Sequence, residues 1–219
     1  MHADRHATTL EPGEIEAAVR TERLNLCGFL DGLDDADWDV QSLCTAWRVR
    51  EVVAHLTVTT RATIRFVLVQ AIRARGSFDR MEVTVARERA ARFTPAELVA
   101  QLRESADSSR RFPGSGPMDP LMDLVIHAQD IARPLGRPYP TSPAVALPSL
   151  VYVAGSRFLG GPKRVTGLEL VATDAEWSGG QGPAVHGTVV DLLLVASGRP
   201  AGLAGLSGPG MDLLARRLA

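Results

Sequence analysis

The sequence predicts a four-helix bundle followed by a small α+β domain. Apolar residues recur with helical spacing in four stretches between residues 12 and 135. Five prolines then cluster between residues 134 and 148, as they do in linkers. Beyond this cluster, short alternating stretches are typical of strands between helices. A chain of 219 residues is long enough for two such domains, each with its own hydrophobic core.

The composition excludes several classes of protein. Hydrophobic residues make up 45% of the chain and charged residues 22%, which is typical of a globular protein. Because the net charge is −1, we expect neither nucleic acid nor an anionic membrane as a partner. No apolar run reaches the roughly 18 residues of a membrane span, and the N-terminus lacks the apolar core of a signal peptide. These features predict a cytoplasmic protein.

The first predicted helix covers residues 12–33. Apolar residues recur along one of its sides, and Gly32 helps to end it. Residues 1–11, which include His2 and His6, are expected to form a loose, exposed arm before this helix.

Two further helices are predicted before residue 119. One begins near Trp47 and reaches residue 74, with a glycine shortly after it. The next has the clearest start signal of the chain, because Thr94, Pro95 and Glu97 have the spacing of a capping box with proline in the first turn.

A fourth helix is predicted over residues 119–135. Asp119 is expected to cap it, and Pro120 suits its first position. At about 100° per residue, the apolar side chains cover nearly the whole circumference, which indicates a buried helix. These side chains are Leu121, Met122, Leu124, Val125, Ile126, Ala128 and Ile131.

One narrow polar stripe interrupts this apolar helix. Asp123, His127 and Asp130 fall within roughly 60° of each other on the helical wheel. Unpaired charges inside a core are costly, so these groups must be paired or hold a metal ion. Asp123 and His127 are four residues apart and can reach the same ion, and His55 on the second helix is a candidate third ligand. A buried network of aspartates, His127 and arginines is the alternative, and the spacing alone does not separate the two hypotheses.

The second half of the chain predicts a small α+β unit. A helix is expected from residue 149 to 159, and an alternating stretch at 165–172 predicts a strand. Later expectations are strands starting at 175 and 184, a helix at 189–197, a strand near 203–206 and a final helix at 211–218.

Other reactive side chains have simpler interpretations. Cys27 and Cys44 have no metal-binding spacing, and we interpret both as structural cysteines. His186 is interpreted as a structural residue as well. Arg199, and the pair Arg216-Arg217, are candidates for binding a substrate carboxylate, with a surface or helix-terminal role as the alternative.

Two motifs resemble a known family. The stretch Leu43-Cys-Thr-Ala-Trp-Arg-Val-Arg-Glu-Val-Val-Ala-His-Leu56 resembles the second-helix signature of mycothiol-dependent maleylpyruvate isomerases and their DinB-like relatives. The stretch Asp123-Leu-Val-Ile-His-Ala-Gln-Asp130 is similar to their fourth-helix signature. The tail from Ala172 through Gly198-Arg-Pro200 is similar to the sterol-carrier-like C-terminal domain of many members.

The resemblance implies a specific organisation and activity. Residues 1–137 would be a DinB-like metal-binding four-helix bundle, and residues 143–219 a small sterol-carrier-like α+β domain. A divalent metal, most simply zinc, would be held by His55, Asp123 and His127. With mycothiol as cofactor, a metal-bound thiolate would then act as the nucleophile in an isomerase or transferase reaction on a small electrophile, and neither protein cysteine would be needed.

The sequence departs from the family pattern at two positions. The isomerases have Glu where this chain has Asp123, which is one methylene shorter, and Arg48 replaces a common Ser or Thr helix cap although Glu51 is retained. Asp130 is expected to contact a ligand or the substrate rather than the ion, and together with Arg199 it is a candidate catalytic residue. The alternative function is a non-catalytic protein of the same fold that binds a metal or small ligand.

Overall fold

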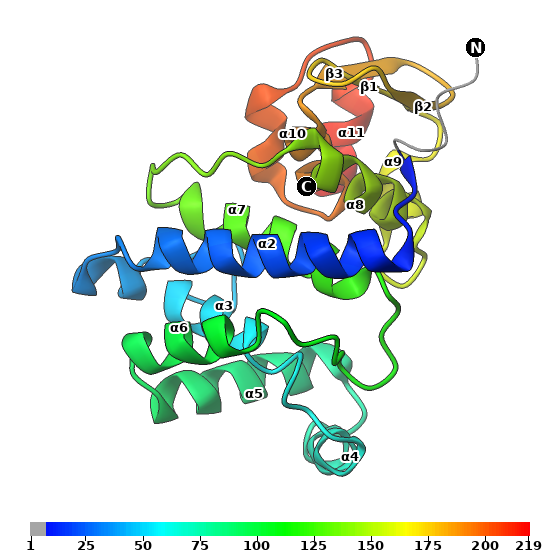
Figure 1. Cartoon of the computed structure of the whole chain (residues 1–219). Coiled ribbons are helices and arrows are strands. Elements are labelled where there is room, and N and C mark those ends of the chain that lie inside the picture. The colour runs from blue at the N-terminus through cyan, green and yellow to red at the C-terminus, as the bar shows by residue number, and fades with distance from the viewer. Residues whose placement is uncertain (1–7) are drawn as a thin grey trace. The chain divides into compact units, whose positions relative to one another are not determined.

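The computed structural model of the chain describes residues 8–219, so the predicted exposure of His2 and His6 lies outside the described residues. The chain divides into two compact units (Figure 1). One is Pro12–Tyr139, and the other includes Pro140–Ala219. No helix of the described part is long and apolar enough to cross a membrane.

The first unit is entirely helical apart from its connections. Helix α2 packs against α6 and α7, while α3 packs against α5, α6 and α7. The elements are α2 (Pro12–Leu30), the 3-10 helix η1 (Asp35–Asp39), α3 (Val49–Leu56), α4 (Ile64–Arg73), α5 (Phe78–Arg92), α6 (Pro95–Glu104) and α7 (Asp119–Ala132).

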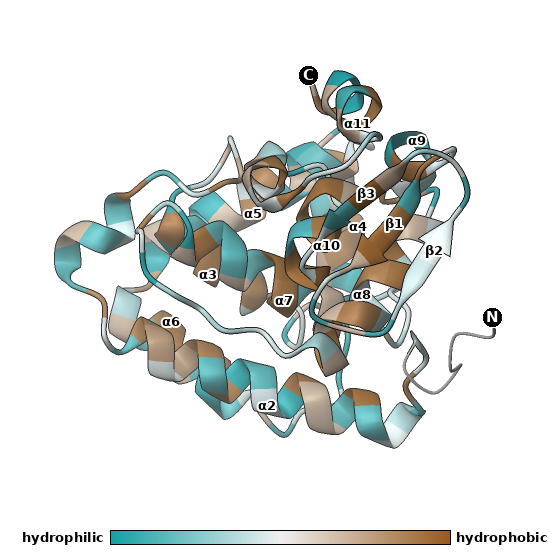
Figure 2. Ribbon diagram, turned by 90° about the horizontal axis from the view of Figure 1, so that it is seen from above, coloured by the Kyte–Doolittle hydropathy of each residue, from teal (hydrophilic) through white to brown (hydrophobic). Residues whose placement is uncertain are grey.

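Helix α7 is the buried helix of this unit, as predicted. All its residues except Asp119 and Asp123 are buried. Figure 2 shows the contrast with α2, on which hydrophilic and hydrophobic residues alternate. The prediction that Asp119 caps the helix is wrong in detail, because Met118 is the N-cap and the Asp119 carboxylate accepts the Gly116 N–H at 2.7 Å.

The prediction of a single helix over residues 47–74 is wrong. The structure has two helices there, α3 and α4, separated by a turn at residues 57–63. The first four of these seven residues, Thr57, Val58, Thr59 and Thr60, are all β-branched, and such side chains crowd the preceding helical turn. The Thr57 hydroxyl bonds back to the Ala54 carbonyl, and Thr63 caps the start of α4 instead of continuing the buried face.

Helix α5 was not predicted, because it has little apolar periodicity. Only Met81, Ala86 and Ala90 are buried along its 15 residues. Its abundant Arg, Glu and Ala residues are good helix formers, and the Ser77 hydroxyl caps its first turn by accepting the Arg80 N–H.

The capping box predicted at Thr94 is present, and the retained Glu51 caps a second helix start. The Glu97 carboxylate accepts the Thr94 N–H at 2.8 Å, and the Thr94 hydroxyl accepts the Glu97 N–H, which confirms the start of α6. At α3 the cap residue is Arg48, whose N–H bonds to the Glu51 carboxylate at 2.7 Å. The retained glutamate therefore performs its capping role without a Ser or Thr before it.

The second unit combines helices with a three-stranded sheet of order β2-β1-β3. Strand β1 pairs antiparallel with β2 and parallel with β3, where the buried Leu170 lies opposite the buried Val185. The elements are α8 (Pro143–Gly155), α9 (Gly161–Val165), β1 (Glu169–Ala172), β2 (Ser178–Gly180), β3 (Ala184–Gly187), α10 (Val189–Ala196), η2 (Pro200–Gly205) and α11 (Met211–Leu218).

Three boundaries in this unit differ from the prediction. The proline cluster is only partly a linker, because Pro143 begins α8 and Pro148 lies inside it. The strand predicted at 165–172 is shorter, since its first residue ends α9. The strand predicted near 203–206 is mostly the 3-10 helix η2, while the final helix, Met211–Leu218, has the predicted bounds. The predicted fold class, a helical bundle followed by a small α+β unit, is confirmed.

Candidate metal centre

The structure brings His55, Asp123 and His127 together. His55 Nε2 lies 3.2 Å from Asp123 Oδ2, and His127 Nε2 lies 3.2 Å from Asp123 Oδ1. One ligand atom from each residue lies within 4.8 Å of the other two. We call these residues the His55–Asp123–His127 cluster. The shorter aspartate side chain thus reaches both imidazoles, one with each carboxylate oxygen.

Local structure explains this convergence. Asp123 and His127 are one helical turn apart on α7, and His55 is in the last turn of α3, which packs against α7. The His55 and His127 side chains are 15% and 7% exposed, so the centre is mostly shielded from solvent.

Trp47 covers the two histidines. Its ring centroid lies 4.8 Å from that of His55 and 5.9 Å from that of His127. The indole is buried, yet its Nε1–H has no hydrogen-bond partner among residues 8–219. A buried donor without a partner is costly, so this N–H beside the cluster is available to a ligand.

Asp130 occupies the other side of the His127 ring. His127 Nδ1 lies 2.8 Å from Asp130 Oδ2, and the Asp130 side chain is fully buried. The Cys44 thiol donates to the same Oδ2, with its Sγ at 3.1 Å, and lies 3.9 Å from His127 Nδ1. The Leu43 N–H also bonds to the Asp130 carbonyl, which ties this loop to α7.

The sequence led us to interpret Cys44 as a structural cysteine. The structure instead places it in a second group, Cys44–His127–Asp130, whose ligand atoms lie within 4.8 Å of one another. The position of Cys44 three residues before Trp47, in the motif that also contains His55, was the signal that could have identified it.

Charge pairing dominates the electrostatics of the centre. Burial acts to lower the pKa of His127, but Asp123 and Asp130 outweigh it and hold that pKa well above its usual value. Burial likewise acts to raise the pKa of Asp123, and the two histidines reverse this effect and lower it. Without a metal, the cluster therefore favours an imidazolium at His127 between two carboxylates.

A third carboxylate near the centre was missed because its helix was not predicted. Glu82 lies on α5, and burial raises its pKa, with the neighbouring His55 acting to lower it and Asp123 to raise it. Glu82 is not part of the group whose ligand atoms lie within 4.8 Å. It lies near the cluster without belonging to it.

The remaining candidates lie in the second unit. Arg199 Nη1 donates to the Ser197 carbonyl at 3.0 Å, and its contact with a substrate stays a prediction. Arg217 donates to the carbonyls of Arg164 and Thr166, so its guanidinium has a structural role there. His186 belongs to β3 and exchanges backbone hydrogen bonds with Ser207, which agrees with a structural role.

Comparison with known proteins gives a consistent picture. Residues 19–118 match the model of the mycothiol maleylpyruvate isomerase N-terminal domain. Crystal structures of the mycothiol-dependent maleylpyruvate isomerase and of a histidine-to-alanine mutant of it are similar in fold, with TM-scores of 0.62 and 0.63. The identities are 15% and 14%, and each match covers 91% of this chain and 93% of the other. No curated protein matches the sequence. The chain is thus similar to the mycothiol maleylpyruvate isomerase N-terminal domain over residues 19–118 and shares the fold of the isomerase structures over most of its length.

Proposed function

We propose that this protein is a metal- and thiol-dependent enzyme that isomerises, or transfers a thiol to, a small electrophilic substrate, with mycothiol as the thiol. The observation that carries this proposal is the His55–Asp123–His127 cluster in a buried setting. The isomerase crystal structures, which are named for mycothiol dependence, support the choice of thiol.

The residues of the cluster fit a divalent ion. Two ligands bound at about 2.1 Å to a tetrahedral zinc lie roughly 3.4 Å apart. The two histidine–carboxylate distances are both 3.2 Å. Two imidazoles and one carboxylate are a common ligand set for catalytic zinc, in which a fourth position remains for water or substrate. The same ligands also suit other divalent metals, and we propose zinc because it is the commonest in such sites.

Asp130 and Cys44 would prepare His127 for this role. If His127 donates its Nδ1–H to Asp130, at 2.8 Å, its Nε2 carries a lone pair directed at the cluster. The Cys44 thiol donates to the same oxygen and so helps to hold the carboxylate in place. Asp130 is therefore a residue that orients a ligand, as the sequence suggested, rather than a ligand itself.

The chemistry of the centre follows from these groups. A divalent ion held there would lower the pKa of a coordinated thiol, so that the thiol could react as a thiolate at neutral pH. Trp47 excludes water from one side of the histidines and offers its Nε1–H to a bound ligand. We further propose residues 1–137 as the metal-binding domain and 143–219 as a sterol-carrier-like domain. A role for Arg199 in binding a substrate carboxylate belongs to the same proposal.

One observation favours the alternative function, a non-catalytic protein of this fold. His127 lies within hydrogen-bond distance of both Asp123 and Asp130, so the polar residues of α7 can satisfy one another without an ion. A protein that kept this network and lost the reaction would have the same fold.

An activity assay distinguishes the proposed enzyme from a non-catalytic binding protein. The zinc-loaded protein is incubated with mycothiol and maleylpyruvate, and loss of the cis double bond and formation of a thiol adduct are both followed. We expect thiol-dependent turnover that His127→Ala abolishes. His186→Ala, which changes a histidine of the other unit, serves as the control and keeps full activity. A zinc-loaded protein that shows neither reaction with this or other activated double bonds would support the binding protein instead.

A further inference from the structure

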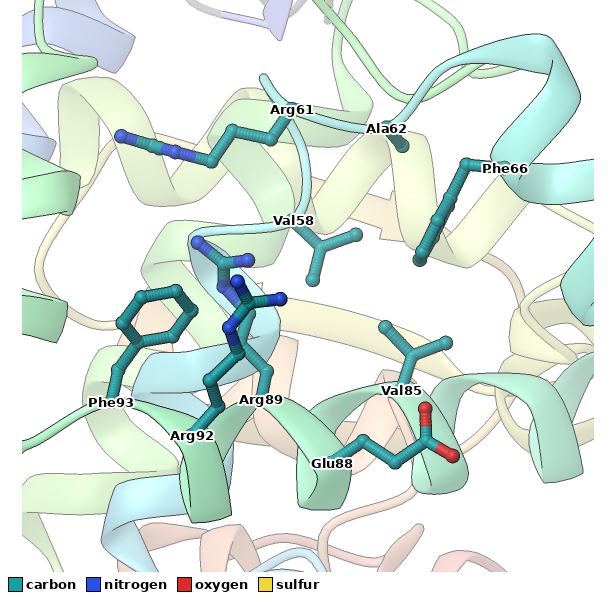
Figure 3. A pocket seen from close by; sticks show the side chains of 9 residues that line it. All are labelled: Val58, Arg61, Ala62, Phe66, Val85, Glu88, Arg89, Arg92 and Phe93. Carbon is teal, nitrogen blue, oxygen red and sulfur yellow. The ribbon is translucent and has the colours of Figure 1, made fainter.

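The bundle unit contains a cavity that the proposed function does not use. Its volume is about 260 Å³, and it lies between the turn after α3, the start of α4 and the C-terminal half of α5. Figure 3 shows the guanidinium groups of Arg89 and Arg92 close together beside Val58, with Phe66 on the other side of Val58. The residues that line it are Val58, Arg61, Ala62, Phe66, Val85, Glu88, Arg89, Arg92 and Phe93.

Positive charge predominates in this cavity. It is lined by three arginines and one glutamate, and the Glu88 carboxylate is already paired with Arg73, with Oε1 2.7 Å from Nη2. Arg61 pairs with Glu104 at 3.3 Å. Within residues 8–219, no carboxylate forms an ion pair with Arg89 or Arg92. The cavity therefore holds two guanidinium groups whose charge is not neutralised by the protein.

Hydrogen bonds hold the Arg89 guanidinium, and both guanidiniums lie over one aromatic ring. Arg89 donates to two neutral oxygens, those of the Thr57 hydroxyl and the Gln101 amide. Both arginines stack on Phe93, with the Cζ of Arg89 4.8 Å and that of Arg92 5.4 Å from the ring centroid. Burial lowers the pKa of Arg89, and the charges of Arg61 and Arg92 add to this effect. An anion in the cavity would relieve the repulsion among the three arginines.

The walls of the cavity limit the kind of anion. Val58, Val85, Phe66 and Phe93 present apolar surface beside the guanidinium groups. A small hydrated anion such as phosphate would contact the arginines but gain nothing from these walls. A carboxylate with an apolar body would use both, because a planar guanidinium forms paired hydrogen bonds with a carboxylate while apolar walls bury the rest of the ligand.

We propose that this cavity is a second ligand site, which binds the carboxylate of a small organic acid with an apolar or aromatic body. None of the residues that line it belongs to the His55–Asp123–His127 cluster. The proposal therefore depends neither on metal binding nor on the proposed reaction.

Benzoate is a suitable probe, because it combines a carboxylate with a small aromatic ring. Isothermal titration is performed on the full chain with a chelator present, so that binding to a metal ion cannot contribute. We expect benzoate to bind, and uncharged benzamide and inorganic phosphate to bind at least roughly tenfold more weakly, because each lacks one of the two required features.

Two variants and a control locate the site. Arg92→Gln removes a guanidinium that has no ion-pair partner, and we expect benzoate affinity to fall by roughly tenfold or more. Arg80→Gln makes the same change at an exposed position on α5 that does not line the cavity, and should leave the affinity unchanged. Val85→Phe fills the cavity without changing its charge and should also weaken binding. Circular dichroism checks that each variant is folded.

Three results would overturn the proposal. The first is no benzoate binding by the folded wild-type protein at millimolar concentration. The second is an equal loss in Arg80→Gln and Arg92→Gln, which would mean attraction to the general positive charge of α5. The third is phosphate binding as strong as benzoate binding and unaffected by Val85→Phe, which would mean an adventitious cationic surface. If Arg92→Gln fails to fold, the benzoate affinities of Val85→Phe and Arg80→Gln are compared instead. An equal affinity in these two variants would overturn the proposal.

Discussion

Helices α7 and α5 both help to form the bundle, but they carry their charges in opposite ways. On α7 the side chains of Asp123, His127 and Asp130 are at most 26% exposed, and each is fixed by partners at 2.8–3.2 Å. On α5 most charged groups face solvent, and ion pairs such as Arg73–Glu88 are half-exposed. Exposed pairs contribute little to stability, whereas a buried charge that loses its partner costs several kcal/mol. Equivalent substitutions on the two helices should therefore have very different effects.

The largest expected effect is at Asp130. Asp130→Ala leaves His127 Nδ1 and the Cys44 thiol without their common acceptor in a fully buried position. We expect the free energy of unfolding to fall by about 3 kcal/mol, measured by urea denaturation. The matched control is Asp79→Ala in the first turn of α5, where the aspartate is exposed and the loss should stay below about 1 kcal/mol. Similar losses in the two variants would remove the distinction between the helices.

Asp123→Asn distinguishes a metal ligand from a partner of an imidazolium. If Asp123 holds an ion, the variant loses zinc affinity and thiol-dependent activity together, because asparagine keeps a donor oxygen but not the charge. If Asp123 only neutralises His127, the variant keeps zinc affinity and loses stability, by about 1–3 kcal/mol. Zinc titration and urea denaturation of the same samples measure both quantities, and the second outcome would contradict the proposed enzyme.

The two cysteines offer a matched pair for a smaller effect. Cys44→Ala removes the thiol that donates to Asp130, and zinc affinity should fall by up to about tenfold, while Cys44→Ser restores a donor and most of the affinity. Cys27→Ala changes a core residue on α2, so it should lower stability and leave zinc affinity unchanged. Equal zinc affinity in all three variants would show that Cys44 has no influence on the centre.

The smallest expected effect is the pH dependence caused by Glu82. Burial raises its pKa above the unfolded value of 4.5, so the folded protein binds the proton more tightly than the unfolded chain. In the metal-free protein, stability should therefore fall as the pH rises through the window that starts at 4.5 and ends at the raised pKa. Glu82→Gln should remove this dependence and be more stable than wild type at pH 8, but not at pH 4. Parallel stability curves for the two proteins across this range would contradict the assignment.

The sequence predicted the site best where polar residues interrupt a helix that is otherwise apolar and buried. Helix α7 was predicted because its apolar residues surround the helix, and its polar stripe stood out for the same reason. Asp123, His127 and Asp130 could thus be identified from helical geometry alone. The prediction for His55 had weaker support, because only its place on the edge of a buried face and the family motif suggested a contact with α7.

The sequence was uninformative where structure depends on packing between distant segments. Helix α5 has almost no apolar periodicity, so neither the helix nor the nearness of Glu82 to the cluster could be predicted. The motif that contains Cys44 also contains His55, but it does not reveal the hydrogen bond from Cys44 to Asp130, 86 residues later. The break between α3 and α4 depends on a run of β-branched residues. It was not predicted, because the apolar pattern continues through this run.

Zinc binding by the metal-free protein tests the central claim most directly. Isothermal titration should give one tightly bound zinc ion per chain for wild type and for His186→Ala, and no stoichiometric zinc for His55→Ala or His127→Ala. Circular dichroism of the last two variants should still show the helical bundle. Zinc binding that is unchanged in both folded variants, or absent from the wild type, would contradict a metal centre at the His55–Asp123–His127 cluster.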